Sequence, residues 1–224
     1  NIRNGMDCVR DLPESRRSDI EAYIALKDEN INNVEYPTAA YIDHIDKFDC
    51  GFFNISPRQA ALMDPHHRVF LETVWEAIED AGYGGNKLVG KNIGVFAGFN
   101  PRLEYKRVVT ETEPSSLADS LTGNLPSLLA SLIAHILDLQ GPNMIINTAC
   151  SSSLVAVHVA CQAIKNNECS MAIVGSIRLS ILPHEDIQSA DIGIVSSTGR
   201  AMVFDDSSNG TGGGEGSVVM LLKP

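Results

Sequence analysis

The sequence has few aromatic residues, a shortage of basic residues and no long apolar run. Aromatic residues make up 6% of the 224 residues, and 17 lysines and arginines stand against 28 aspartates and glutamates, a formal net charge of -11. A chain this acidic repels a phosphate backbone, which disfavours nucleic-acid binding. Since no apolar segment reaches the roughly 20 residues that cross a bilayer, we predict no membrane partner either.

The cysteines are too scattered for a disulfide framework. The chain contains five of them, and no two form a CxxC pair. An odd number without such pairs disfavours both disulfides and a zinc site, and the histidines lack carboxylate or cysteine companions at ligand spacing, so we predict no metal site. We expect reduced thiols in a cytoplasmic protein.

Apolar and amphipathic segments alternate along the chain, which predicts an α/β protein with a central, largely parallel sheet. Ser56-Pro57 and Asp64-Pro65 each place a capping side chain before a proline, so two helices should follow one another, the second over residues 65–81. Loops and a short helix are expected before residue 50. Further helices are predicted at 124–142 and 151–166, and strands at 92–99, 143–149, 169–177 and 217–224.

The predicted helix 151–166 is apolar on nearly every side after its serines. This pattern predicts a helix enclosed by other elements, because a surface helix has a polar face.

Cys150 lies in the stretch NTACSSSL (147–154), where a predicted strand meets that helix. Helix N–H groups and the helix dipole favour a thiolate there, and the Cys150 N–H is placed to stabilise a developing oxyanion. A lone cysteine in an apolar stretch is nevertheless often a packing residue, as we predict for Cys161 and Cys169. His158 lies roughly 12 Å along the helix, too far to be the base. The local sequence leaves both interpretations of Cys150 open.

A glycine cluster, NGTGGGEG, occupies residues 209–216. It matches neither phosphate-binding glycine motif, and a predicted strand follows where such a motif needs a helix. Glu215 is either a loop anchor that accepts backbone N–H groups or a solvated charge. The pattern favours the anchor.

Four stretches together resemble the ordered motifs of β-ketoacyl synthases, and more narrowly the ketosynthase domain of a modular type I polyketide synthase. They are DPHHRVFLETVWEAIEDAGY (64–83), NIGVFAG (92–98), LDLQGPNMIINTACSSSLVAVHVACQAI (137–164) and FDDSSNGTGGGEGSVVMLLKP (204–224). The resemblance implies a thiolase-like αβαβα layered sandwich made of two similar α/β halves. Residues 1–224 are then expected to be the N-terminal part of one ketosynthase domain, without the C-terminal half.

The resemblance also implies a reaction. Cys150 would accept an acyl chain from the phosphopantetheine arm of an acyl carrier protein, and a malonyl-type extender would then undergo decarboxylative Claisen condensation with it. The catalytic histidines, a lysine and the second oxyanion donor are expected from the other half, so this chain alone should not complete the condensation. The chain is expected to bind no cofactor itself.

The same resemblance places Asn147, Phe204, Gly214, Glu215 and Gly216 in loops near the site. It leaves the residues that contact the phosphopantetheine arm unassigned. The implied partners are the acyl carrier protein, other polyketide synthase domains and a second copy in a homodimer.

Three residues depart from the family pattern. Asn147 replaces the usual Asp, Leu132 stands where Arg is common, and Gly213 stands where Arg is frequent. These departures leave open a non-elongating ketosynthase that only transfers acyl chains. A non-catalytic partner similar to a chain-length factor is a further alternative, which the retained Cys150 disfavours. A hydrolase using Cys150 or Ser151 lacks a GxSxG motif, and thiolase is a more distant resemblance.

Overall fold

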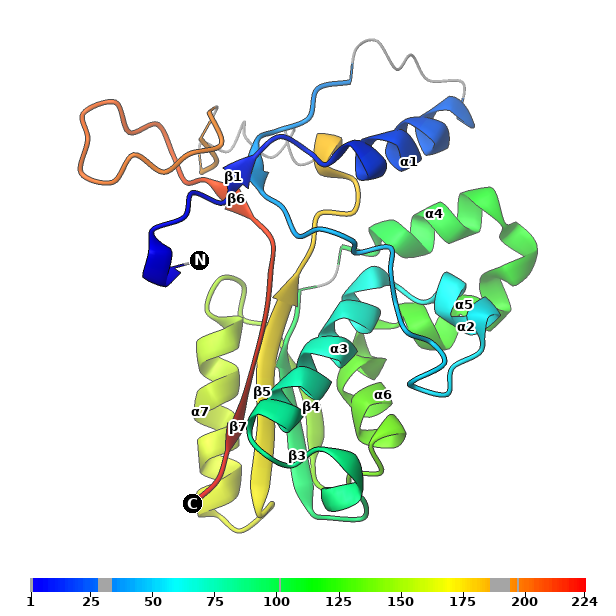
Figure 1. Ribbon diagram of the computed structural model, residues 1–224, viewed down its shortest axis with the longest axis vertical. Coiled ribbons are helices and arrows are strands. Elements are labelled where there is room, and N and C mark those ends of the chain that lie inside the picture. The colour runs from blue at the N-terminus through cyan, green and yellow to red at the C-terminus, as the bar shows by residue number, and fades with distance from the viewer. Residues whose placement is uncertain (1, 28–33, 101, 186–193, 197) are drawn as a thin grey trace. The chain divides into compact units, whose positions relative to one another are not determined.

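The chain folds into two compact units, seen in the computed structural model of Figure 1. The smaller unit contains residues 1–44 and 179–215, and the larger contains residues 45–178 and 216–224. The structure describes residues 2–27, 34–100, 102–185, 194–196 and 198–224.

A four-stranded sheet with the order β4-β3-β5-β7 forms the centre of the larger unit. β3 (Ile93–Gly98) pairs in parallel with β4 (Asn143–Ile146) and β5 (Met171–Arg178). β7 (Gly216–Leu222) pairs antiparallel with β5. The predicted central, largely parallel sheet is therefore confirmed, with its strands close to the predicted positions.

Helices cover both faces of this sheet. α7 (Ser152–Lys165) packs on one face, and α3 (Pro65–Asp80) and α6 (Leu129–Ile136) pack on the other (Figure 1). Phe96 of β3 is fully buried in the same core cluster as Ala156 of α7. Small alanines on the buried side of α7 let the helix lie close to the strands.

The two predicted proline-started helices are confirmed. Ser56 caps α2 (Pro57–Leu62) by accepting a hydrogen bond from the Gln59 N–H, and the Gln59 side chain completes the capping box. Asp64 caps α3 by accepting from the His66 N–H. The other helices described in the larger unit before residue 124, for which the sequence made no prediction, are η3 (Gly85–Lys87), α4 (Glu104–Thr112), η4 (Pro114–Ser116) and α5 (Leu117–Asn124). The 3-10 turn η5 (Pro126–Leu128) lies within the helix predicted at 124–142.

The helix predicted at 124–142 was placed too broadly. Its regular part is α6, which follows the single 3-10 turn η5. Pro126 cannot donate to a preceding helical turn, and Asp138 adopts a left-handed conformation with φ of 49°, so both ends are cut short. Within the described ranges, even the 16-residue α3 is too short and too polar to cross a bilayer.

The prediction that residues 151–166 form an enclosed helix was wrong. Only four residues of α7 are buried, namely Ser152, Ala156, Ala160 and Ala163. Leu154, on another side of the helix, is 75% exposed. The sheet of this unit covers one side of the helix, and the small residues line that side, so the apolar residues elsewhere on α7 remain accessible.

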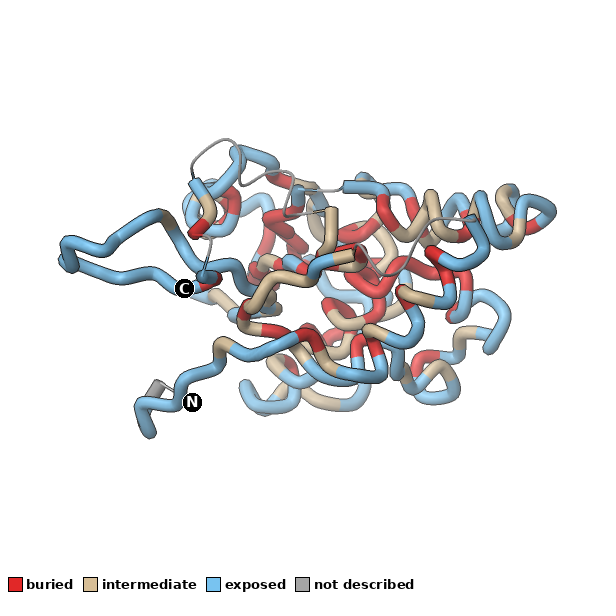
Figure 2. The backbone as a smooth tube through the Cα atoms, turned by 90° about the horizontal axis from the view of Figure 1, so that it is seen from above, coloured by how far each residue is buried: buried red, intermediate tan, exposed pale blue. Residues whose placement is uncertain are grey.

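The described part of the smaller unit contains one α-helix, α1 (Glu14–Ala25), which confirms the short helix expected before residue 50. A small sheet with the order β1-β2-β6 joins Val9–Arg10, Ala39–Ala40 and Gly213–Gly214. Two 3-10 turns, η1 (Ile2–Asn4) and η6 (Pro183–Glu185), complete its regular elements in the described ranges. The loop 201–209 is exposed along its length (Figure 2).

A buried ion pair joins four segments of the smaller unit. The Glu215 carboxylate accepts hydrogen bonds from Nη1 and Nη2 of Arg16 and from the backbone N–H groups of Ile42 and Ser180, each at 2.8 Å. Arg16 Nη2 also donates to the Ser180 carbonyl at 2.7 Å. The Arg16 and Glu215 side chains are only 6% and 2% exposed. Glu215 is therefore a loop anchor and not a solvated charge.

Replacing Glu215 by Gln should destabilise the protein strongly. The substitution leaves the Arg16 guanidinium buried without its counter-charge, which typically costs about 3–5 kcal/mol. Chemical denaturation should show the lower free energy of unfolding. Asp7→Asn is the matched control, because Asp7 pairs with Arg200 on the surface, with side chains 58% and 49% exposed, and its loss should produce no measurable change. Equal midpoints for the two variants would contradict the role of the Arg16–Glu215 pair.

The N-terminus of α3 carries a buried cluster of ionisable residues. Asp64 accepts from the His66 N–H at 2.8 Å and lies 2.7 Å from His66 Nδ1. Burial opposes ionisation of Asp64, but the hydrogen bond from His66 and the neighbouring imidazoles outweigh it and lower the pKa of the carboxyl. His67 is 1% exposed, and burial lowers its pKa to about 4, against the opposing attraction of Asp64. His67 is thus neutral in the folded protein near neutral pH.

The buried His67 should make the protein acid-sensitive. The unfolded chain binds a proton at this residue below pH 6.5, whereas the folded protein does so only below about pH 4. The neutral His67 therefore contributes its full amount to the free energy of unfolding above pH 6.5. This contribution declines by up to about 3 kcal/mol as the pH falls toward 4. Unfolding free energies measured across this range should fall less steeply for His67→Gln. The control His158→Gln, at an exposed position of α7, should keep the wild-type slope. If the unfolding free energy of His67→Gln falls with pH as steeply as that of the wild type, His67 is not the cause of the acid sensitivity.

Candidate active site

Cys150 lies in a tight turn between β4 and α7, beyond the carboxyl end of the strand (Figure 1). Ala149 adopts a left-handed conformation with φ of 55°, and Ser151 is the N-cap residue of α7. Cys150 is exposed, so the interpretation as a buried packing thiol does not apply to it. Cys169, by contrast, is buried, and burial raises the pKa of its thiol, as expected for a packing residue.

The serines beside Cys150 hold this turn in place. Ser152 Oγ accepts from the Thr148 N–H at 2.9 Å and donates to the Ala149 carbonyl at 2.7 Å. Ser151 Oγ lies 2.8 Å from the Thr148 carbonyl and 2.9 Å from Thr148 Oγ1. These hydroxyls bond to backbone groups of Thr148 and Ala149 in the turn before α7, which explains why small hydrogen-bonding residues follow the cysteine.

Gly98, the last residue of β3, allows the first turn of α7 to approach the sheet. A Cβ atom at this position would lie 3.0 Å from the Ser152 carbonyl carbon and 3.0 Å from the Ser153 nitrogen. The next residue, Phe99, donates its N–H to the Ile146 carbonyl at 3.1 Å and continues the pairing with the end of β4. The backbone on both sides of Cys150 is therefore fixed by the sheet.

Asn147 connects this turn to the end of β3. Its Oδ1 accepts from the Ala149 N–H at 3.2 Å, and its Nδ2 donates to Asn100 Oδ1 at 3.2 Å. An amide can do both, whereas an ionised carboxylate can only accept. Asn147 thus positions the turn through a donor that Asp would lack. Neither Gly98 nor Asn100 was identified as a site residue from the sequence, because their roles depend on the contact between β3 and the turn.

The other predicted site residues lie elsewhere in the chain. Phe204 belongs to the exposed loop of the smaller unit and has a φ of 59°. Gly214 ends β6, and Glu215 forms the ion pair with Arg16. Gly216 begins β7 in the larger unit. Of the predicted set, Asn147 and Cys150 are the two that share one turn.

No group of three or more His, Cys, Asp or Glu side chains in the described part of the chain converges as metal ligands. Of the histidines considered as candidates, His66 is bound to Asp64, and His158 is exposed on α7.

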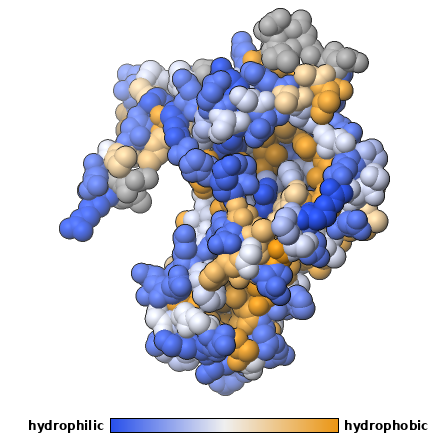
Figure 3. Space-filling model, turned by 45° about the vertical axis from the view of Figure 1, so that its right-hand side comes forward, coloured by the Kyte–Doolittle hydropathy of each residue, from blue (hydrophilic) through white to orange (hydrophobic). Residues whose placement is uncertain are grey.

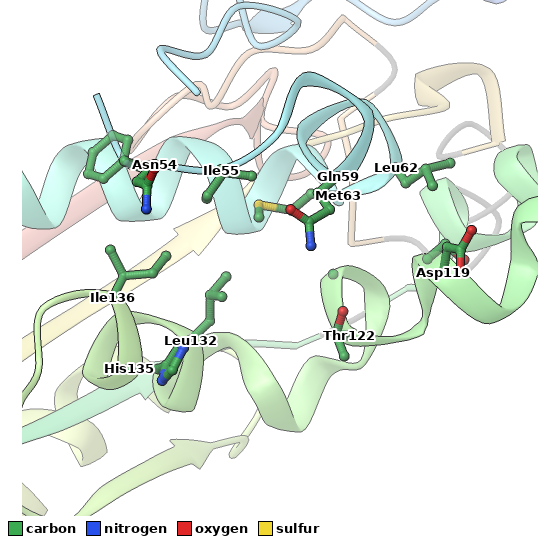
Figure 4. Close-up of a pocket in the computed structure, with 13 residues that line it drawn as sticks. Asn54, Ile55, Gln59, Leu62, Met63, Asp119, Thr122, Leu132, His135 and Ile136 are labelled. Atoms are coloured by element: carbon green, nitrogen blue, oxygen red, sulfur yellow. The ribbon is translucent and has the colours of Figure 1, made fainter. Parts of the chain in front are cut away.

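A cavity of about 390 Å³ lies between α2, α5 and α6, and Cys150 is not among its lining residues. Ile55, Gln59 and Met63 line one side and Leu132 the other, with the Leu132 side chain directed toward the space (Figure 4). Figure 3 shows apolar surface interspersed with hydrophilic surface on one face of the molecule. Leu132, which departs from the family pattern, lines this cavity and lies outside the turn that contains Cys150.

The family comparison agrees with these motifs. The family model described as Beta-ketoacyl synthase, N-terminal domain, matches residues 1–224. The chain belongs to the β-ketoacyl synthase family. It is 38% identical to Polyketide synthase PksM of Bacillus subtilis (strain 168), with 100% of this chain aligned to 5% of that protein. It is 34% identical to the pikromycin polyketide synthase component PikAII of Streptomyces venezuelae, covering 99% of this chain and 6% of PikAII.

Solved ketosynthases have the same fold. The ketosynthase from module 6 of the bacillaene synthase of Bacillus subtilis 168 aligns with a TM-score of 0.77 and 34% identity, over 99% of this chain and 35% of that one. The oxazolomycin ketosynthase domain OzmH KS7 of Streptomyces albus aligns with a TM-score of 0.81 and 31% identity, over 99% and 39%. The predicted thiolase-like fold is confirmed. The acyl carrier protein, the homodimer and the cytoplasmic location stay predictions.

Gly98→Ala should slow the acyl transfer that the family resemblance implies for Cys150. The new methyl group would push against the backbone of Ser152 and Ser153, and a shift of the turn by a fraction of an ångström should cost about tenfold in rate. The rate can be measured with an acyl-cysteamine thioester and mass spectrometry of the Cys150 peptide. Gly51→Ala is the control, since a Cβ there makes only an ordinary 3.5 Å contact with Asp49. If Gly98→Ala is acylated as fast as Gly51→Ala, the close approach of α7 to Gly98 is unnecessary for the reaction of Cys150.

Asn147→Asp should reduce the reactivity of Cys150 toward iodoacetamide. The added negative charge lies within the same turn and disfavours a neighbouring thiolate, so we expect alkylation at pH 7 to slow several-fold at low salt and the difference to shrink at about 1 M salt. Asn86→Asp, at an exposed position before the amino end of β3, is the charge-matched control. If both variants react at the wild-type rate, the neutral amide has no electrostatic role.

Proposed function

We propose that the ketosynthase domain containing this chain transfers an acyl group to Cys150 and then condenses it with a malonyl-type extender. The Cys150 thiolate attacks the carbonyl carbon of a phosphopantetheine thioester on an acyl carrier protein. A new carbon–sulfur bond forms to Cys150, and the carrier's thiolate leaves and takes up a proton. The Cys150 N–H is the proposed donor to the oxyanion that forms during the attack.

Condensation completes the proposed cycle. The carrier-bound extender loses CO₂, and the resulting carbanion attacks the acyl carbonyl carbon. Cys150 then leaves as a thiolate, and the β-ketoacyl chain remains on the carrier protein. The catalytic histidines and lysine of this step belong, by the family resemblance, to a C-terminal half. The chain itself spans 35% of the solved bacillaene ketosynthase.

The observation that carries the proposal is the exposure of Cys150 in a fixed turn at the carboxyl end of β4, the edge strand that pairs in parallel with β3. Ligand sites of α/β sheets form at this end of parallel strands. The turn is fixed by hydrogen bonds from Ser151 and Ser152, and the family membership of the chain supplies the reaction class. Other polyketide synthase domains are the proposed partners, because the matched region makes up only 5% of PksM.

A second candidate is a non-elongating ketosynthase, which accepts an acyl chain on Cys150 and passes it on without condensation. Asn147 is the observation in its favour, because the family usually has Asp at this position. In the structure, Asn147 donates to Asn100, a bond that Asp could not form in the same way. Acyl transfer to Cys150 is common to both candidates, and CO₂ release separates them.

Cys150→Ala should abolish formation of the acyl adduct. The domain is incubated with an acyl-loaded carrier protein, and the modified peptide is located by mass spectrometry. Cys161→Ala is the control, because Cys161 is a partly buried residue of α7 and should keep the adduct. An adduct that survives in Cys150→Ala would refute the nucleophile assignment. Adding a malonyl carrier protein then yields a β-keto product with CO₂ release for condensation, or acyl transfer alone for the second candidate.

A further inference from the structure

Two buried side chains of the larger unit line one small cavity, and each has a polar atom that lacks a hydrogen-bond partner within the part of the chain that the structure describes. One is Nδ1 of His67 in α3, and the other is Oδ1 of Asn124, the last residue of α5. The two residues are 1% and 3% exposed. Buried polar atoms of folded proteins are nearly always paired, so two orphaned atoms at one place require a partner.

The cavity has the size of a single water molecule. Its volume is about 10 Å³, and Asp64, His66 and Phe99 also line it. A polar cavity accommodates a water molecule when roughly 10–15 Å³ is open to it and two to four polar groups are available. Asn124, His67 and the Asp64 carboxylate are such groups.

The hydrogen bonds that Asn124 already forms determine which donor and acceptor groups a molecule bound in the cavity must have. Asn124 Nδ2 donates to the carbonyls of Leu62 at 2.6 Å and Ser120 at 2.8 Å, which fixes the orientation of the amide. Its Oδ1 can therefore only accept, and it needs a donor. Nδ1 of a neutral imidazole donates in one tautomer and accepts in the other. Water can donate to Asn124 and match either tautomer of His67, whereas an anion could not donate to the amide oxygen.

We propose that this cavity binds one structural water molecule, which donates to Asn124 Oδ1 and forms a hydrogen bond with His67 Nδ1. The water would connect the buried N-terminus of α3 to the end of α5. Both histidines of α3 pack against Phe99, with ring centroids 5.3 Å apart for His66 and 6.3 Å apart for His67. By holding His67 in place, the water would also help to fix the Phe99 ring, which directly follows β3.

A high-resolution crystal structure of the ketosynthase domain tests the proposal. We expect one fully occupied water whose oxygen lies within about 3.2 Å of both His67 Nδ1 and Asn124 Oδ1. The wild-type structure alone overturns the proposal if no density lies there, or if the two side chains bond directly to each other.

A pair of variants provides the second test. His67→Phe replaces the imidazole by an apolar phenyl ring and removes both ring nitrogens, so the water density should be lost. His135→Phe, at an exposed position of α6, is the matched control and should retain the water. Water that stays fully occupied in His67→Phe would show that His67 is not its partner and would overturn the assignment. If His67→Phe does not fold, the wild-type structure decides the question.

Discussion

The close packing of the first turn of α7 against the end of β3 fixes the position of Cys150. A side chain at Gly98 would meet the backbone of Ser152 and Ser153 at 3.0 Å, so the two elements touch without intervening atoms. Parallel pairing of β3 with β4 brings the chain to this contact, and the left-handed Ala149 reverses its direction within the turn. The cysteine is thereby held at the edge of the sheet with its thiol exposed. A nucleophile held in this way needs little reorganisation to react.

A buried carboxylate in each unit is stabilised by several local hydrogen bonds. In the smaller unit, the Glu215 carboxylate receives four hydrogen bonds from Arg16 and two backbone N–H groups. In the larger unit, Asp64 accepts from both the backbone and the side chain of His66. Both carboxylates lie next to the end of a regular element, β7 or α3. Each carboxylate holds neighbouring backbone segments in place through the hydrogen bonds that it accepts.

The strands and the capped helices could be predicted from the sequence because their signals are local. Apolar runs between glycines located β3, and Ser56-Pro57 and Asp64-Pro65 located α2 and α3. The burial of α7 could not be predicted, because periodicity shows which residues are apolar but not which side of a helix has a neighbour. Gly98 and Asn100 were missed for a related reason, since they matter only through contacts between segments distant in sequence. Local chemistry left Cys150 with two interpretations, and the family motifs favoured the nucleophile.

The most direct test of the proposed role of Cys150 is a crystal structure of the ketosynthase domain after reaction with an acyl thioester. We predict continuous density from Cys150 Sγ to the acyl carbonyl carbon, with the carbonyl oxygen within hydrogen-bonding distance of the Cys150 N–H. Turn residues 147–152 should keep the conformation of the unreacted protein. Acyl density on any other side chain, or a carbonyl oxygen directed away from the Cys150 N–H, would contradict the account.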